Sequence, residues 1–302
     1  MIYPRLLKEG DKVAIVAPAG KLKPNALDNA VKALQEWGLK VELGSNLYGD
    51  NGYFSGTDEE RLSDLQNAIN DKSIAAIICG RGGYGLTRIL ERVNYTPLLD
   101  NPKWIVGFSD ITAIQLKLSA LGMASIHGPM GVSFNMEGAQ DSLNALKELL
   151  FGGASKLTSK KSEGKNGQTR GIITGGNLAL VADSIGTPNE IDTDNKILML
   201  EEVGEMTYRV DRMLYQLLRA GKLDNLAGLV IGDFSDIEEG DTPFGTTWKE
   251  ELDKVLESFD YPVAYGFNLG HEAINMPVAA GGEYELKVTS GSATLELITN
   301  LD

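Results

Sequence analysis

Residues 74–90 of this 302-residue chain read IAAIICGRGGYGLTRIL, and they decide the fold. The apolar run 74–79 predicts a buried strand, and residues 86–90 begin a helical period. Between them lie three glycines with the G-x-G-x-x-G spacing of a dinucleotide-binding turn: Gly80, Gly82 and Gly85. A strand that leads directly into a glycine turn is typical of an α/β sheet whose backbone comes close to a ligand.

The same alternation of strand and helix patterns continues on both sides of this stretch. Strand patterns lie at 11–18, 39–44, 104–108 and 124–127, and helix patterns lie within 24–37, 57–71 and 110–122. Strands that alternate with helices predict a mostly parallel sheet with helices on both faces. Ligands of such sheets bind at the carboxyl ends of the strands, where the glycine turn and the stretch GFSD lie.

The composition changes at residues 151–170, FGGASKLTSKKSEGKNGQTR, which are poor in large apolar residues. This change predicts a linker between an N-terminal α/β domain, residues 1–150, and a C-terminal domain, residues 171–302. The second half has strand patterns and helix patterns in mixed order, and it ends in two strand patterns joined by SGS, which predict a β-hairpin. We therefore expect a C-terminal domain of mixed α/β structure.

Charge and composition exclude several classes of partner. The chain has 28 basic and 42 acidic residues, a net charge of −14, and its one lysine-rich segment is short. Nucleic acid and anionic membrane surfaces are therefore not expected partners. The single cysteine excludes an internal disulfide, and with only two histidines we expect no metal centre. A secretory signal pattern and a membrane-span pattern are both missing, so we expect a cytoplasmic protein.

Ser109 is the first residue with possible chemistry, because it stands in VGFSDIT at a strand-to-helix junction. Position alone favours a helix cap, since serine and aspartate oxygens accept the unpaired amides of a first turn. The alternative is a nucleophile elbow, in which a tight turn exposes the hydroxyl. Ile111 replaces the last glycine of the G-x-S-x-G pattern, which argues against an ordinary α/β-hydrolase.

A serine nucleophile needs a base and a group that orients the base. The two histidines are His127, at the end of a strand pattern, and His271, in the polar loop NLGHEAINMP. Glu201 and Glu202 end the apolar run KILMLEE, and either carboxylate would orient a histidine or pair with Arg209 and Arg212.

Cys79 is a rival nucleophile, because a thiolate near a helix start can be activated. Its position in the apolar run IAAIIC favours a small core residue instead.

Seven segments, taken together and in order, resemble the LD-carboxypeptidase family of serine peptidases, and the match to the family extends from about residue 13 to residue 282. This family also includes proteins that confer immunity to the antibiotic microcin C. The segments are GTDEERLSDLQNAI, GRGGYG, VGFSDIT, HGPM, GGNLAL, LMLEEVGEMTYRVDRML and GHEAINMPVAAGG. The resemblance implies two domains with the active site at their interface.

The resemblance also implies a catalytic triad of Ser109, Glu201 and His271. The family usually has Leu-Glu-Asp where this chain has Leu200, Glu201 and Glu202, so the choice between the two glutamates stays open. With Ser109 as nucleophile, the amides of Asp110 and Gly83 are placed to form an oxyanion hole.

We hypothesise that Arg81, in the glycine turn, binds the free carboxylate of the substrate, since a guanidinium can bind both carboxylate oxygens.

The implied activity is removal of terminal D-alanine from muropeptide tetrapeptides through an acyl-enzyme, as part of peptidoglycan recycling. No cofactor is needed, a homodimer is implied, and the stem residue, lysine or meso-diaminopimelate, stays open. The nearest alternative is a microcin C immunity-type hydrolase of aminoacyl adenylate analogues. Less favoured are a nicotinamide oxidoreductase that uses the glycine turn and Asp110, and a non-catalytic ligand-binding protein.

Overall fold

The computed structural model describes residues 1–301 and divides them into two compact units. Unit 1 contains Met1–Ser155, Ala273–Gly281 and the end of the chain from Asn300, and unit 2 contains Lys156–Glu272 and Gly282–Thr299. The chain therefore passes between the units more than once, whereas the sequence pattern predicted one linker.

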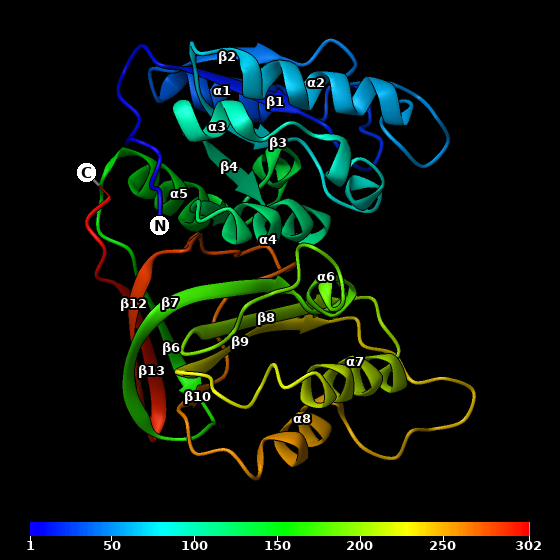
Figure 1. Cartoon of the computed structure of the whole chain (residues 1–302), viewed down its shortest axis with the longest axis vertical. Coiled ribbons are helices and arrows are strands. Elements are labelled where there is room, and N and C mark those ends of the chain that lie inside the picture. Colours follow the sequence, from blue (N-terminus) through cyan, green and yellow to red (C-terminus); the bar gives the residue numbers. More distant parts are fainter. Residues whose placement is uncertain (302) are drawn as a thin grey trace. The chain divides into compact units, whose positions relative to one another are not determined.

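Unit 1 contains a six-stranded sheet in the order β11-β5-β4-β3-β1-β2 (Figure 1). Its strands are β1 (Lys12–Val16), β2 (Lys40–Leu43), β3 (Ile74–Cys79), β4 (Trp104–Gly107), β5 (Ser125–His127) and β11 (Val278–Ala280). All neighbours are parallel except β11, which is antiparallel to β5. Every residue of β3 and β4 is buried, which explains why both are continuous apolar runs. The predicted mostly parallel sheet is confirmed.

Five α-helices belong to unit 1: α1 (Asp28–Glu36), α2 (Asp58–Asn70), α3 (Thr96–Asp100), α4 (Thr112–Ala120) and α5 (Gln140–Phe151). Helix α2 packs against β1 and β3, and α4 packs against β5. Helix α2 begins with a capping box, in which Thr57 and Glu60 each accept the other's backbone N–H.

The segment Ala273–Gly281 belongs to unit 1, although the sequence pattern placed it in the C-terminal domain. Its strand β11 extends the first sheet through β5, and the amide of Asn275 donates to Oγ of Ser142 at 2.8 Å. These contacts join residues far apart in the chain, so a local pattern does not reveal them.

Unit 2 contains a seven-stranded sheet in the order β10-β9-β8-β7-β12-β13-β6 (Figure 1). Its strands are β6 (Lys156–Ser162), β7 (Gly167–Asn177), β8 (Ile197–Val203), β9 (Gly228–Ser235), β10 (Val263–Ala264), β12 (Glu283–Thr289) and β13 (Gly291–Leu297). From β7 to β10 the neighbours are parallel, and from β7 to β6 they are antiparallel. Its helices are α6 (Leu178–Ser184), α7 (Thr207–Arg219) and α8 (Trp248–Leu256). The predicted mixed domain and terminal hairpin are confirmed.

The segment 151–170, expected as a linker, instead contains β6 and the beginning of β7. Leu157, Ser159 and Ser162 are buried in β6, whereas Lys156, Thr158 and Lys160 are exposed. Two of the three buried positions are serines, so the strand lacks the alternating apolar signal by which it would be recognised.

The helix expected after the glycine turn is replaced by two 3-10 turns, Leu86–Arg88 and Leu90–Arg92. Side chains bind the backbone here, since the amide of Leu86 donates to Asp110 at 2.8 Å and the carbonyl of Gly85 accepts from Arg61 at 2.8 Å. The turn therefore does not lead into the long helix that holds a pyrophosphate in a dinucleotide-binding fold.

Candidate active site

Ser109 lies in a tight turn between β4 and α4. The turn Ser109–Ile111 is a single 3-10 turn, and Ser109 has φ of +62°. A side chain in this left-handed region costs about 1–2 kcal/mol and is rare for residues other than glycine, asparagine and aspartate. A helix cap has extended backbone, and here Phe108 occupies that position. The prediction of a capping serine is therefore wrong, and the strained turn has the geometry of a nucleophile elbow.

Two glycines make room for this turn. A Cβ on Gly107 would lie 2.8 Å from Cγ1 of Ile111. The Ile111 side chain therefore leaves no room for a side chain at position 107, the last residue of β4. A Cβ on Gly82 would lie 3.1 Å from Cβ of Ser109. The glycine turn after β3 is therefore packed directly against Ser109.

Asp110 fixes the glycine turn to the serine turn. Its side chain is buried, and its Oδ2 accepts the Leu86 amide. The sequence predicted a role for the Asp110 amide only, and the structure adds this role for its carboxylate.

Gly83 has φ of +103°, and the carbonyl before it, that of Gly82, accepts the amide of Gly20 at 2.9 Å. Because N–H and C=O point in opposite directions across a trans peptide, the Gly83 amide points away from Gly20. Arg81 is exposed, and its Nη1 donates to the carbonyl of Lys21 at 2.8 Å.

An exposed aromatic cluster, Tyr53, Phe54 and Tyr84, borders the glycine turn and was missed by the sequence analysis. A Cβ on Gly83 would lie 3.0 Å from the Tyr53 hydroxyl. Tyr53 is 57% exposed and Tyr84 is 50% exposed, and their ring centroids lie 5.7 and 5.9 Å from that of Phe54. The stretch GYFSG between β2 and α2 was the one available signal.

In unit 2, Glu201 and His271 form a pair. Glu201 is fully buried at the end of β8, and its Oε2 lies 2.8 Å from Nδ1 of His271. An ionised carboxylate can only accept, so Nδ1 carries the proton in the neutral ring and the basic lone pair is on Nε2. Arg209, expected as a possible partner of the glutamates, pairs with Glu205 instead, at 3.5 Å.

Glu202 is also buried but binds other groups. It accepts from Nδ2 of Asn177 at 2.9 Å and from the amides of Ala179 and Val203, both at 2.8 Å. Burial raises the pKa of Glu202 above its ordinary value. Glu202 therefore serves the start of α6, and Glu201 is the carboxylate in contact with His271.

Asp233 on β9 is a further acid beside this pair, and the sequence analysis did not identify it. Gly270, with φ of +137°, separates the two acids: a Cβ there would lie 3.2 Å from Cβ of Glu201 and 3.3 Å from Cβ of Asp233. Burial, with the nearby charges of Glu272 and Glu201, raises the pKa of Asp233 to about 7.

The rival residues are core residues of unit 1. His127 is fully buried in β5, with its ring edge-on to Phe108 at 6.1 Å between centroids. Burial raises the pKa of the Cys79 thiol to about 12, so at neutral pH it is not a thiolate.

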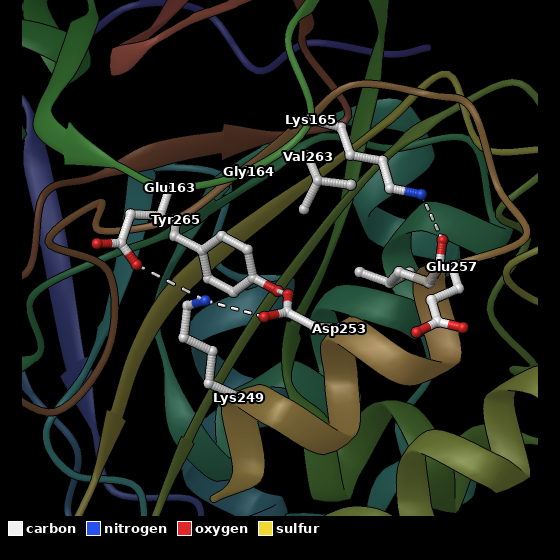
Figure 2. A pocket seen from close by; sticks show the side chains of 9 residues that line it. Glu163, Gly164, Lys165, Lys249, Asp253, Glu257, Val263 and Tyr265 are labelled. Carbon is white, nitrogen blue, oxygen red and sulfur yellow. Dashed lines mark hydrogen bonds and ion pairs between the residues drawn. The ribbon is translucent and has the colours of Figure 1, made fainter.

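Unit 2 contains a cavity of about 430 Å³, in which Lys249 lies between two acidic side chains and Lys165 is bound by backbone carbonyls (Figure 2). Lys249 lies 2.9 Å from Asp253 and 3.7 Å from Glu163, and Lys165 donates to the carbonyl of Leu256 at 2.5 Å. Its lining comes from α8, β10 and the β6–β7 turn, and the residues predicted for catalysis are not part of it.

Within residues 1–301, the Cys, His, Asp and Glu side chains form no group of three or more arranged to hold a metal ion. The helices of these residues are too short or too polar to span a membrane.

Both halves of the chain match family models: residues 13–128 match the LD-carboxypeptidase N-terminal domain and residues 170–286 match the LD-carboxypeptidase C-terminal domain. A probable murein peptide carboxypeptidase of Bacillus subtilis is 32% identical over 97% of this chain and 94% of its own length.

Solved structures are similar as well. The muramoyltetrapeptide carboxypeptidase of Oxalobacter formigenes is 30% identical, with a TM-score of 0.86 over 95% of this chain and 98% of that protein. The microcin C7 self immunity protein MccF, at 20% identity, shares the fold with a TM-score of 0.89 over 100% of both chains. By both domain matches and by these relatives, the chain belongs to the LD-carboxypeptidase family of serine peptidases.

Proposed function

We propose that this chain removes terminal D-alanine from muropeptide tetrapeptides as a serine L,D-carboxypeptidase with the triad Ser109, Glu201 and His271. The bond cleaved joins D-alanine to an L-configured centre, lysine or meso-diaminopimelate. The observation that carries the proposal is the left-handed turn at Ser109, with Gly82 packed against it. A strained serine at the carboxyl end of a parallel strand is typical of a nucleophile, because backbone strain clusters at active sites and ligands of such sheets bind at this edge.

In the proposed mechanism, Oγ of Ser109 attacks the scissile carbonyl and Nε2 of His271 takes the hydroxyl proton. The imidazolium that forms is stabilised by Glu201, which is fully buried and therefore poorly screened by solvent. His271 then protonates the leaving amine of D-alanine, and water activated by the same histidine hydrolyses the acyl-enzyme.

The oxyanion of the tetrahedral intermediate is proposed to bind the amides of Asp110 and Gly83. The Asp110 amide is in the first turn that leads to α4, where backbone N–H groups carry partial positive charge. The direction of the Gly83 amide, away from Gly20, supports the second donor.

The terminal carboxylate of the substrate is proposed to bind Arg81. Its guanidinium has five N–H donors, and the bond to the Lys21 carbonyl holds it next to the glycine turn while using one of them. A bidentate pair with a carboxylate would distinguish a free carboxyl terminus from an amidated one.

A second candidate function is hydrolysis of aminoacyl adenylate analogues, in line with the fold shared with MccF. The muropeptide substrate is favoured because three relatives that are at least 30% identical over most of the chain are named murein peptide, murein tetrapeptide or muramoyltetrapeptide carboxypeptidase, whereas MccF is 20% identical. An L,D-tetrapeptide and an aminoacyl sulfamoyl adenylate, assayed side by side, separate the two functions. Cleavage of the tetrapeptide alone is the expected result, and rapid cleavage of the adenylate alone would contradict it.

The proposal further places the enzyme in the cytoplasm, in peptidoglycan recycling, as a homodimer. Peptidoglycan recycling and the homodimer rest on the family resemblance, and the cytoplasmic location is the expectation drawn from the sequence. Light scattering on the purified protein tests the homodimer, and a mass of a single chain at micromolar concentration would contradict it.

A further inference from the structure

Two carboxylate oxygens beside His271 are buried without a hydrogen bond. Within residues 1–301, neither Oε1 of Glu201 nor Oδ2 of Asp233 has a partner that donates to it. The two acids are on the adjacent strands β8 and β9. Their Cβ atoms lie 3.2 and 3.3 Å from the single point where a Cβ of Gly270 would stand, so they are within about 6.5 Å of each other.

Two neighbouring carboxylates, each with one buried oxygen that lacks a donor, are unfavourable when both are ionised, because their charges repel and these oxygens are desolvated. A single proton removes both the repulsion and the missing hydrogen bond: one acid stays protonated, and its O–H group donates a hydrogen bond to the ionised acid. Glu201 accepts the N–H of His271 through Oε2, so it is the acid that must stay ionised. Asp233 is therefore the acid that holds the proton.

We propose that Asp233 is a positioning residue for the catalytic acid: its protonated carboxyl donates to Oε1 of Glu201, which leaves Oε2 directed at Nδ1 of His271. The inference rests on the proposed function, in which Glu201 and His271 are triad members. Asp233 acts through Glu201 and does not itself take part in bond cleavage.

The surroundings of Asp233 support this role. The charged groups that face it are Glu201 from β8 and His271 and Glu272 from the segment after β10; the two glutamates favour its protonated form and His271 opposes it. With a pKa of about 7, Asp233 is about half protonated at neutral pH and is mostly protonated below it. Its amide donates to the carbonyl of Leu269 at 2.7 Å, two residues before His271. Asp233 is thus hydrogen-bonded to the segment that carries the base, and it lies on the strand next to the acid that orients the base.

The test compares the pH dependence of kcat/KM for D-alanine release by wild type, Asp233→Asn and Asp233→Ala. Asparagine keeps a neutral N–H donor, so we expect it to stay within about threefold of wild type at pH 6.5, whereas alanine loses about tenfold or more, mainly in kcat. Above pH 7 the wild-type rate falls as Asp233 ionises, and the asparagine variant does not show this fall. Asp236→Asn, a change at an exposed aspartate three residues later, is the matched control and follows wild type.

Equal losses in Asp233→Asn and Asp233→Ala at pH 6.5, or the same fall above pH 7 in Asp233→Asn as in wild type, would overturn the inference. A second readout does not depend on activity: carboxyl ¹³C NMR of wild type, with the Asp233 signal assigned by its loss in Asp233→Asn. A titration midpoint near pH 7 supports the inference, and a midpoint below pH 5 overturns it. A Ser109→Ala variant as active as wild type would instead overturn the proposed function. The NMR titration would still report the protonation state of Asp233, because it does not depend on activity.

Discussion

Replacement of Glu201 and of Glu202 by glutamine, one at a time, should separate catalysis from stability. The two residues are adjacent, both buried, and the substitution is isosteric in each case. Oε2 of Glu201 lies 2.8 Å from Nδ1 of His271, whereas Glu202 accepts two hydrogen bonds from the start of α6 and one from the amide of Val203. Sequence alone did not distinguish them, so the structure makes a prediction that the sequence did not.

For Glu201→Gln, the loss is the attraction between a carboxylate and the imidazolium that forms during catalysis. Two unit charges about 4 Å apart attract by about 4 kcal/mol at an effective dielectric constant of about 20. Because the carboxylate is fully buried, solvent screens this attraction little. The expected loss in kcat is therefore about a thousandfold.

In Glu202→Gln, the side-chain NH₂ group takes the place of one carboxylate oxygen. If it replaces Oε2, it faces the backbone N–H of Ala179; if it replaces Oε1, it faces the N–H groups of Asn177 and Val203. One buried donor left without an acceptor costs about 1–3 kcal/mol. In a chain of this length, that loss corresponds to a fall in Tm of about 2–5 °C. We expect kcat to stay within about tenfold of wild type, because Glu202 does not contact His271.

The assay is release of D-alanine from an L,D-tetrapeptide, detected with D-amino acid oxidase, beside a thermal melt of each variant. Glu201→Gln should melt close to wild type and be nearly inactive, and Glu202→Gln should melt earlier and remain active. The reverse pattern, with Glu202→Gln the slower enzyme and Glu201→Gln the less stable protein, would refute the assignment of the two carboxylates.

Three other predictions concern Arg81, Ser109 and Asp233. Arg81→Ala should lower kcat/KM about tenfold or more toward a free-carboxylate tetrapeptide and leave the amidated form unchanged; equal kinetics of variant and wild type on both substrates would remove its assigned role. Ser109→Gly should melt above Ser109→Ala, by the equivalent of about 1 kcal/mol, because glycine relieves the strain at φ of +62°; equal melting temperatures would argue against stored strain. The pKa of Asp233 is raised in the folded state from 3.8 to about 7, so its protonated form favours folding. This stabilisation is complete below about pH 4 and is lost as pH rises through 7. Denaturant unfolding from pH 4 to 8 should therefore show wild type losing stability relative to Asp233→Asn, and parallel curves would contradict the shift.

Much of the fold of unit 1 was predictable because a parallel sheet buried on both faces requires continuous apolar strands. The run IAAIIC is such a strand, and its six residues are all buried. Strand β6 was missed because serines occupy two of its buried positions, and β11 because its pairing with β5 joins distant parts of the chain. The prediction of a helix after the glycine turn was wrong: the segment forms two 3-10 turns, and side chains from other parts of the chain, Asp110 and Arg61, bind the backbone where the first turn begins.

The candidate site was predictable at the level of residue types and positions along the chain. Ser109 was found, but its left-handed backbone, which distinguishes an elbow from a cap, is a property of the turn as folded. Strand alternation places Glu201 and Glu202 on opposite faces of β8 without saying which face His271 approaches. Nothing in the local sequence around Asp233 distinguishes it from other acids near strand ends. It was not predicted because its proximity to Glu201 depends on the pairing of β8 with β9.

The most direct test of the central claim, that Ser109 is the nucleophile of an L,D-carboxypeptidase, is the rate of D-alanine release from an L,D-tetrapeptide by Ser109→Ala. The account predicts a correctly folded protein whose rate is about 10⁴-fold or more below that of wild type. A folded Ser109→Ala variant that releases D-alanine within tenfold of the wild-type rate would contradict it.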